Sequence, residues 1–316
     1  MLDRDELAEA LAAQVVVLRV VIAEVKGSSP REVGAAMLVW PGGQAGTIGG
    51  GALEHLATVR AREMLVRGEL RHLARYPLGP ALGQCCGGAV ALLFERFEAV
   101  PEGEVIARPV TAAAVGAMPL AVRRVLAAQR AQGVAPDCQL VQGWFVEPVA
   151  RPSRQIWIWG AGHVGRALVG VLAPLPDLAI TWVDTAPERF PTAIPPGVTV
   201  VPAADPAGLV AYAPQGAEHL VLTYSHALDL ELCHRILGHG FAGLGVIGSQ
   251  TKAARFRARL HDLGHLVTEI QRITCPIGDV RLGKHPQAIA LGIAASLLAG
   301  AGQAASRPRT RGERRA

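Results

Sequence analysis

The stretch that decides the fold reads IWIWGAGHVGRAL and occupies residues 156–168. Its first four residues are β-branched or aromatic, which is typical of a buried strand. Glycine then recurs at Gly160, Gly162 and Gly165, where the pattern turns helical. Such glycines permit a tight turn, close approach of a phosphate and close packing of a helix on the strand. The stretch therefore predicts the first strand–turn–helix unit of a Rossmann-like domain.

The residues that follow continue this alternation. Strand-like runs occupy 156–159, 179–183, 198–201, 219–224 and 243–248, and helical runs occupy 163–172, 206–212, 229–238 and 251–263. The alternation predicts βαβ units and a parallel sheet. Asp184 ends the second strand, where the acid of a dinucleotide site binds a ribose hydroxyl. Ser225 and His226 follow the fourth strand, with Asp229 close behind, and we expect these three residues to cap the next helix and to line the cleft at the carboxyl ends of the strands.

The first half has a mixed pattern of strands and helices. It predicts helices over 3–12 and 52–67 and strands over 15–25, 35–40, 44–48 and 89–95. Gly49, Gly50 and Gly51 lead into the second of these helices. The amino end of a helix approached by glycines is a ready anion site, because its N–H groups are free and its dipole is positive there. A tight strand-to-helix turn without any ligand is the simpler alternative.

Two adjacent cysteines, Cys85 and Cys86, lie between glycines. Adjacent residues cannot chelate one metal as a CxxC motif does, and a disulfide between them would be strained. Two thiols in a glycine-rich loop would be reactive if a helix end or a cation lowered their pKa. The alternative is that both are small buried hydrophobic side chains.

Composition excludes several classes of protein. With 316 residues, 50% of them hydrophobic and only 18% charged, the chain is long enough for two folded domains. No apolar run reaches the roughly 20 residues of a membrane span, and charged residues at 3–6 interrupt any signal peptide, so we expect a soluble cytoplasmic protein. The five cysteines are odd in number and fit a reducing compartment. The net charge of +5 comes largely from arginines in 307–316, and aromatic residues make up only 4%, so a nucleic-acid partner is not expected.

Taken together, several ordered segments resemble the XdhC/CoxI family of accessory proteins for molybdenum hydroxylases. In the first half the resemblance rests on the segments Gly27–Arg31 with Gly34–Ala35, Gly46–Gly51 with Leu53–Glu54, and Leu82–Gly88. In the second half it rests on the segments Trp159–Leu168, Ser225–Asp229, Ile247–Lys252, Cys275–Gly278 and Gly283–Pro286. Two positions depart from the family pattern. Tyr224 stands where members often have His, and Ala186 stands where many have Arg, which puts an anion contact on that side in doubt.

The resemblance implies a carrier of the molybdenum cofactor (molybdopterin) rather than a metabolic enzyme. It implies that the chain supports sulfuration of the cofactor with a cysteine desulfurase and its insertion into apo-xanthine dehydrogenase. Under this hypothesis Gly49–Gly51 or Gly160–Gly165, with His163, hold the cofactor phosphate, and Cys85 or Cys86 lies near molybdenum. No membrane partner is expected, and the high apolar content favours a homodimer.

Two other hypotheses remain open. The glycine turn and Asp184 suit an NAD(P)-dependent oxidoreductase, although no proton-transfer pair for a hydride site is evident. A structural adaptor that joins desulfurase and target without holding cofactor is also compatible with the sequence. In each case the predicted organisation is an α/β chain with an XdhC/CoxI-type domain over 1–100, a connecting region and linker over 101–154, a Rossmann-like domain over 155–302 and a basic, disordered tail over 303–316.

Overall fold

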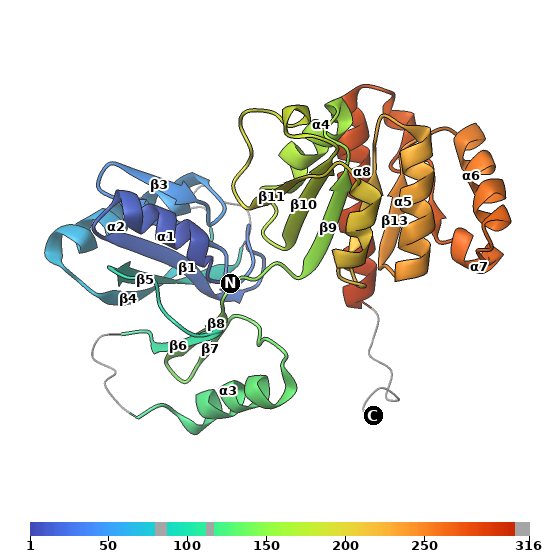
Figure 1. Cartoon of the computed structure of the whole chain (residues 1–316). Coiled ribbons are helices and arrows are strands. Elements are labelled where there is room, and N and C mark those ends of the chain that lie inside the picture. Colours follow the sequence, from blue (N-terminus) through green and yellow to red (C-terminus); the bar gives the residue numbers. More distant parts are fainter. Residues whose placement is uncertain (80–86, 112–116, 307–316) are drawn as a thin grey trace. The chain divides into compact units, whose positions relative to one another are not determined.

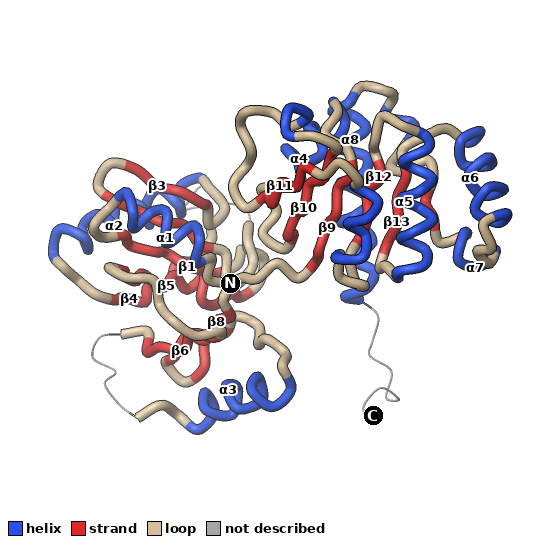
Figure 2. The backbone as a smooth tube through the Cα atoms, viewed as in Figure 1, coloured by secondary structure: helices blue, strands red, loops and turns tan. Residues whose placement is uncertain are grey.

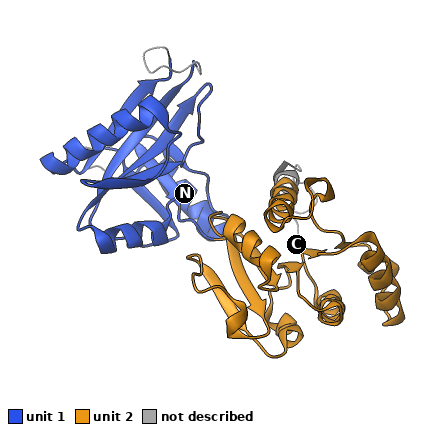
Figure 3. Ribbon diagram, turned by 90° about the horizontal axis from the view of Figure 1, so that it is seen from above, with its two compact units in different colours: residues 1–151 blue, residues 152–316 orange. Residues whose placement is uncertain are grey.

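The computed structural model describes residues 1–79, 87–111 and 117–306. The chain divides into two compact units, Met1–Arg151 and Pro152–Ala316 (Figure 3). Most of the predicted connecting region therefore folds as part of unit 1. The last helix continues to Ser306, so the first four residues of the predicted tail are helical. The predicted fold class, a mixed α+β domain followed by a Rossmann-like domain with a parallel sheet, is confirmed.

Unit 1 contains a five-stranded antiparallel sheet with the strand order β3-β2-β1-β5-β4. The strands are β1 (Val17–Lys26), β2 (Ala36–Trp40), β3 (Gly43–Gly46), β4 (Arg71–Pro77) and β5 (Ala89–Phe97), and the helices are α1 (Arg4–Ala13) and α2 (Gly51–Arg67) (Figure 1). The sequence patterns predict all of these elements except β4. That strand is mostly half-buried and shows no apolar alternation, which hides it from a period-two search.

Strand β1 is buried on both faces. Val20 and Ile22 belong to a core cluster that includes the apolar side of α2, whereas Val21 and Ala23 belong to a second cluster with Phe145. A strand covered on both sides needs apolar residues at every position rather than at alternate ones. This two-sided burial explains why residues 15–25 are apolar at every position except Arg19 and Glu24.

A three-stranded sheet with the order β6-β8-β7 covers the second face. Its elements are β6 (Val105–Pro109), β7 (Gln139–Val141) and β8 (Trp144–Pro148), and the segment between β6 and β7 contains α3 (Leu120–Gln132). All of its strand pairings are antiparallel.

Four buried charges join the two sheets of unit 1. Arg19 on β1 donates to both carboxylate oxygens of Glu147 on β8, at 2.8 and 2.9 Å. Arg108 on β6 pairs with Glu147 and with Glu95 on β5. Burial raises the pKa of Glu147, but the two guanidinium groups outweigh this and hold it below the ordinary value. Buried charges are tolerated only when paired, so this cluster fixes β6 and β8 to the five-stranded sheet.

Unit 2 contains a six-stranded parallel sheet with the order β11-β10-β9-β12-β13-β14. The strands are β9 (Arg154–Trp159), β10 (Leu178–Asp184), β11 (Val198–Pro202), β12 (Glu218–Val221), β13 (Gly243–Val246) and β14 (Ile273–Thr274). The helices are α4 (His163–Leu172), α5 (His226–His239), α6 (Gln250–Asp262), α7 (Val267–Ile270) and α8 (Pro286–Ser306), with 3₁₀ turns η2 (Pro187–Arg189), η3 (Pro206–Tyr212) and η4 (Val280–Leu282). The order reverses direction at β9 and β12, as in a doubly wound nucleotide-binding fold.

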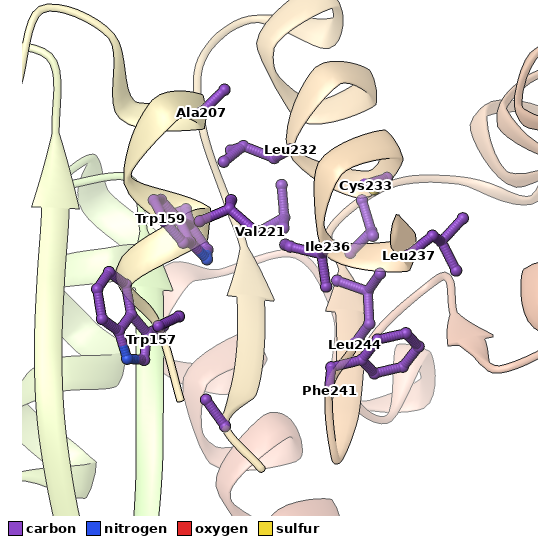
Figure 4. Close-up of a cluster of buried hydrophobic side chains, with 14 of the residues drawn as sticks. Trp157, Trp159, Ala207, Val221, Leu232, Cys233, Ile236, Leu237, Phe241 and Leu244 are labelled. Atoms are coloured by element: carbon purple, nitrogen blue, oxygen red, sulfur yellow. The ribbon is translucent and has the colours of Figure 1, made fainter. Parts of the chain in front are cut away.

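Helices cover both faces of this sheet (Figure 2). On β9, Trp157 and Trp159 face a core cluster shared with α5 and η3 (Figure 4). Ile156 and Ile158 face the opposite cluster, shared with α4 and α8. Although α8 is apolar, no helix in the described part of the chain is both long enough and apolar enough to cross a membrane.

Candidate functional site

The glycine turn between β9 and α4 forms the centre of the candidate site. Gly160 has a φ of 121°, and a Cβ there would lie 2.5 Å from the Leu222 carbonyl oxygen. A Cβ on Gly165 would lie 2.0 Å from the carbonyl oxygen of Gly160. The fold itself therefore requires both of these glycines. Gly162 differs, because its φ is −73° and its Cβ position meets no atom within 4 Å.

Gly162 is also the N-cap of α4, and no side chain caps this helix. The first N–H groups of a helix lack partners within the helix, and the helix dipole places partial positive charge there. The open space at Gly162 lets a ligand approach these groups closely. His163, the first residue of α4, is exposed beside them.

The carboxylate of Asp184, at the end of β10, is buried against this turn. Its Oδ2 accepts from the backbone N–H of Ala161 at 2.5 Å, and its Oδ1 accepts from the N–H of Thr185 at 2.6 Å. Arg189 lies 3.4 Å from the same Oδ1. Asp184 thus ties the glycine turn to β10, and a ribose hydroxyl would have to share oxygens that already accept hydrogen bonds.

Two arginines surround the turn. Arg166 on α4 donates from Nε to the carbonyl oxygen of Ala161 at 3.0 Å and from Nη2 to that of Arg189 at 2.7 Å. The guanidinium of Arg189 lies over the ring of Tyr224, 4.8 Å from its centroid. Arg189 therefore supplies a cation near Asp184, although position 186, where many family members have arginine, is alanine. The turn has the positive charge that an anionic ligand group needs.

Ser225 caps the helix that follows the neighbouring strand, as predicted. Its Oγ accepts from the N–H of Leu228 at 3.3 Å, and His226 is the exposed first residue of α5. Because β12 pairs directly with β9, these residues follow the strand next to the glycine turn. The structure thus places Ser225 and His226 at the same sheet edge as Gly160–Gly165 and Asp184.

A buried ion pair lies behind this edge. Asp229 on α5 accepts from Thr223 Oγ1 at 2.7 Å, and its other oxygen contacts the Nζ of Lys252 on α6 at 2.5 Å. Lys252 also donates to the carbonyl oxygen of Ile247 at 2.8 Å. Both side chains of the pair are at most 8% exposed. The pair joins the start of α5, the start of α6 and the end of β13, and so holds the edge of the sheet in place.

The glycine loop of unit 1 holds an anion from its own chain. Glu54 Oε2 accepts from the N–H groups of Ile48 and Gly50, both at 3.0 Å, and from Thr47 Oγ1 at 2.5 Å. Burial raises the pKa of Glu54, but these hydrogen bonds outweigh it and lower the value below the ordinary one. Gly49, Gly50 and Gly51 all have positive φ, from 66° to 121°, so the backbone alone requires glycine there. The geometry matches the turn without a ligand better than a phosphate cradle.

The predicted thiols, Cys85 and Cys86, lie outside the described residues. The described cysteines, Cys138, Cys233 and Cys275, are free, and burial raises the pKa of each thiol. Raised values keep these thiols protonated and poorly reactive. Within residues 1–79, 87–111 and 117–306, no group of three His, Cys, Asp or Glu side chains could hold a metal ion.

Comparison with known families identifies both halves of the chain. Residues 156–297 match the XdhC Rossmann domain, and residues 10–77 match the XdhC and CoxI family. The chain belongs to the XdhC and CoxI family. The first match contains the glycine turn, Asp184 and the Asp229–Lys252 pair of this XdhC-family chain, and the second contains Gly49–Gly51.

Two relatives extend the comparison. The XdhC-family chain is 28% identical over 177 residues to the uncharacterised protein YqeB of Escherichia coli, a match that covers 55% of the chain but only 32% of YqeB. It is similar in structure to a Bacillus halodurans protein described as a xanthine dehydrogenase, with a TM-score of 0.72 and 20% identity over 97% of the chain and 98% of that protein. At this identity the second likeness shows a shared fold.

Sequence reasoning missed three residues of this XdhC-family chain. Arg189 lies five positions beyond the predicted acid, where no fixed spacing draws attention to it. Lys252 was visible only as part of a family segment, and its partner Asp229 lies 23 residues away. Glu54 was likewise visible only as part of a family segment, but its role could have been found locally, because an acid at the fourth position of α2 can reach back to the amino end of the helix.

Proposed function

We propose that this chain is an accessory protein of a molybdenum hydroxylase that carries the molybdenum cofactor. In this role it supports sulfuration of the cofactor with a cysteine desulfurase and delivers it to apo-xanthine dehydrogenase. The observation that carries the proposal is the match of the XdhC and CoxI family to residues 10–77 together with the XdhC Rossmann domain at 156–297.

The residues at the Rossmann turn fit the phosphate of molybdopterin. Gly162 leaves open space at the uncapped start of α4, and Arg189 supplies a cation beside it. The loop at Gly49–Gly51 fits less well, because Glu54 already accepts hydrogen bonds from its amides. Once bound, the cofactor supplies the molybdenum centre of the target enzyme. In the proposal the chain's part is to bind the phosphate, orient the cofactor and release it to the target.

The first experiment is an analysis of the full-length protein purified from a host that makes molybdenum cofactor. The protein is oxidised and denatured, the fluorescent pterin derivative is quantified, and molybdenum is assayed in parallel. The proposal expects near-stoichiometric pterin and molybdenum. Absence of both, even after incubation with excess cofactor, would overturn the carrier role and leave the adaptor and the NAD(P)-dependent oxidoreductase as the remaining hypotheses.

Variants then locate the phosphate. Arg189→Ala removes a charge-assisted contact, so we expect pterin retention to fall about tenfold. Arg259→Ala, which removes an exposed arginine on α6, serves as the matched control and should retain pterin like the parent. Equal retention by both variants would show that the turn does not hold the phosphate.

Two further readouts separate the rival functions. The carrier role predicts that Cys85→Ala or Cys86→Ala impairs activation of the target enzyme, whereas an adaptor without cofactor tolerates both changes. An oxidoreductase predicts measurable hydride transfer with a nicotinamide nucleotide. In the structure both oxygens of the Asp184 carboxylate already accept hydrogen bonds, which makes it a weaker partner for a ribose diol.

A further inference from the structure

A cavity lies in unit 2, at the opposite edge of the sheet from the glycine turn. It has a volume of about 790 Å³. Its wall includes the first residues of three strands, Arg154 on β9, Glu218 on β12 and Gly243 on β13, together with residues of α8. The glycine turn, Ser225 and Asp229 follow the carboxyl ends of these strands. The cavity is therefore separate from the candidate cofactor site.

Two glycines line this cavity although the packing of the chain does not require glycine at either position. A Cβ on Gly243 would meet only the Glu218 side chain at an ordinary 3.5 Å, and a Cβ on Gly300 would meet no atom within 4 Å. Neither residue has a φ in the left-handed region. Both residues line the cavity, so glycine on β13 and on α8 leaves its space free of two side chains that the packing would otherwise accept.

Other glycines of the same wall show the contrast. A Cβ on Gly245 would lie 2.1 Å from Cδ1 of Ile277, and Gly278 has a φ of 77°. The fold requires these two, as it does not require Gly243 and Gly300.

The lining has an apolar body and a positively charged rim. Leu220, Ile277 and Ile293 supply apolar surface. Arg154 and Glu218 neutralise each other through two hydrogen bonds, at 2.6 and 2.8 Å.

Arg272 also lines the cavity. Its Nη2 donates to the carbonyl oxygen of Phe241 at 2.8 Å, but no carboxylate of the described residues lies within ion-pairing distance. The rim thus keeps one net positive charge. Pockets of this size with apolar walls and a few polar groups are typical of small-molecule sites.

We propose that this cavity binds an amphipathic organic anion, with its apolar body between β13 and α8 and its acidic group at Arg272. An apolar body matches the aliphatic walls, and a single carboxylate, sulfonate or phosphate balances the unpaired guanidinium. This site is independent of the proposed cofactor site, so either can fail without the other.

The test uses the full-length protein and the fluorescent probe anilinonaphthalene sulfonate, an aromatic anion. We expect saturable binding at one site per chain. Phenylnaphthylamine, which has the same apolar body and no charge, should bind about tenfold more weakly, and Arg272→Gln should weaken binding of the sulfonate by about the same factor. Equal affinities for the two probes, or an unchanged affinity in the variant, would overturn the anionic class.

A second pair of variants tests the location. Gly300→Leu fills the cavity from α8 and should abolish saturable binding of the probe. The matched control is Gly170→Leu, the same change in α4 at an exposed position with nothing within 4 Å and away from the cavity. Circular dichroism establishes that both variants are folded. Undiminished binding in folded Gly300→Leu, or equal loss in both variants, would overturn the site.

Discussion

His219 on β12 should make the stability of unit 2 fall in mild acid. The side chain is completely buried, and its ring is stacked on that of Trp159. Its Nδ1 lies 3.2 Å from the indole Nε1 of Trp159. Because an indole nitrogen only donates, Nδ1 must carry a lone pair, so the proton of the neutral ring is on Nε2. The native contact therefore requires neutral histidine.

The magnitude follows from the shift of the pKa. Burial, with a further contribution from His239, lowers the pKa of His219 from 6.5 to about 4. Between these values the unfolded chain binds more protons than the native one, so stability falls as pH decreases through this window. A shift of this size corresponds to about 3 kcal/mol between pH 7 and pH 4. That is a large part of the roughly 5–15 kcal/mol that stabilises a typical domain.

The assay is urea unfolding at a series of pH values, followed by tryptophan fluorescence. His219→Phe removes the titrating group, so its stability should depend on pH by about 3 kcal/mol less than that of the parent. Comparing pH dependences cancels the constant cost of losing the Trp159 contact. His261→Phe changes an exposed histidine on α6 and should behave like the parent. If His219→Phe keeps the full acid dependence, or if NMR titration places the pKa of His219 near 6.5, the reasoning is refuted.

Three further predictions concern the candidate site and the glycine loops, each measured by urea unfolding. Lys252→Met leaves the buried carboxylate of Asp229 without its partner and should lower the free energy of unfolding by about 3–5 kcal/mol. The double variant with Asp229→Asn should recover part of this loss, and if the effects of the two substitutions simply add, the pairing is contradicted. Glu54→Gln removes the charge that the loop amides bind and should cost about 1 kcal/mol at neutral pH; an unchanged stability would argue against the anion contact. Gly160→Ala should cost about 2 kcal/mol because its Cβ meets a backbone carbonyl, whereas Gly162→Ala should be nearly neutral, and equal costs would show that the two glycines have the same role.

Some features of this protein follow from the sequence alone. The run at 156–159 and the glycine turn after it predict β9 and α4, and the structure places α4 over the predicted residues 163–172. Ser225 is identified as a helix cap by its residue type and position. These features depend on backbone dihedral preferences and on hydrophobic periodicity, which act between residues close together in the chain.

Other features were decided only by the tertiary structure. The partners Arg19 and Glu147 are 128 residues apart, and Asp229 and Lys252 are 23 apart, so no local pattern reveals either pair. The sequence also does not reveal that the second face of β1 is covered. The sheet β6-β8-β7, which covers it, lies in the region that the sequence predicts to be a connection between domains. Whether a glycine is required by the fold or left open for a ligand, as at Gly160 and Gly162, depends on which atoms surround it. Local preferences therefore determined the elements, whereas burial and charge pairing, which need the folded chain, determined how the site is built.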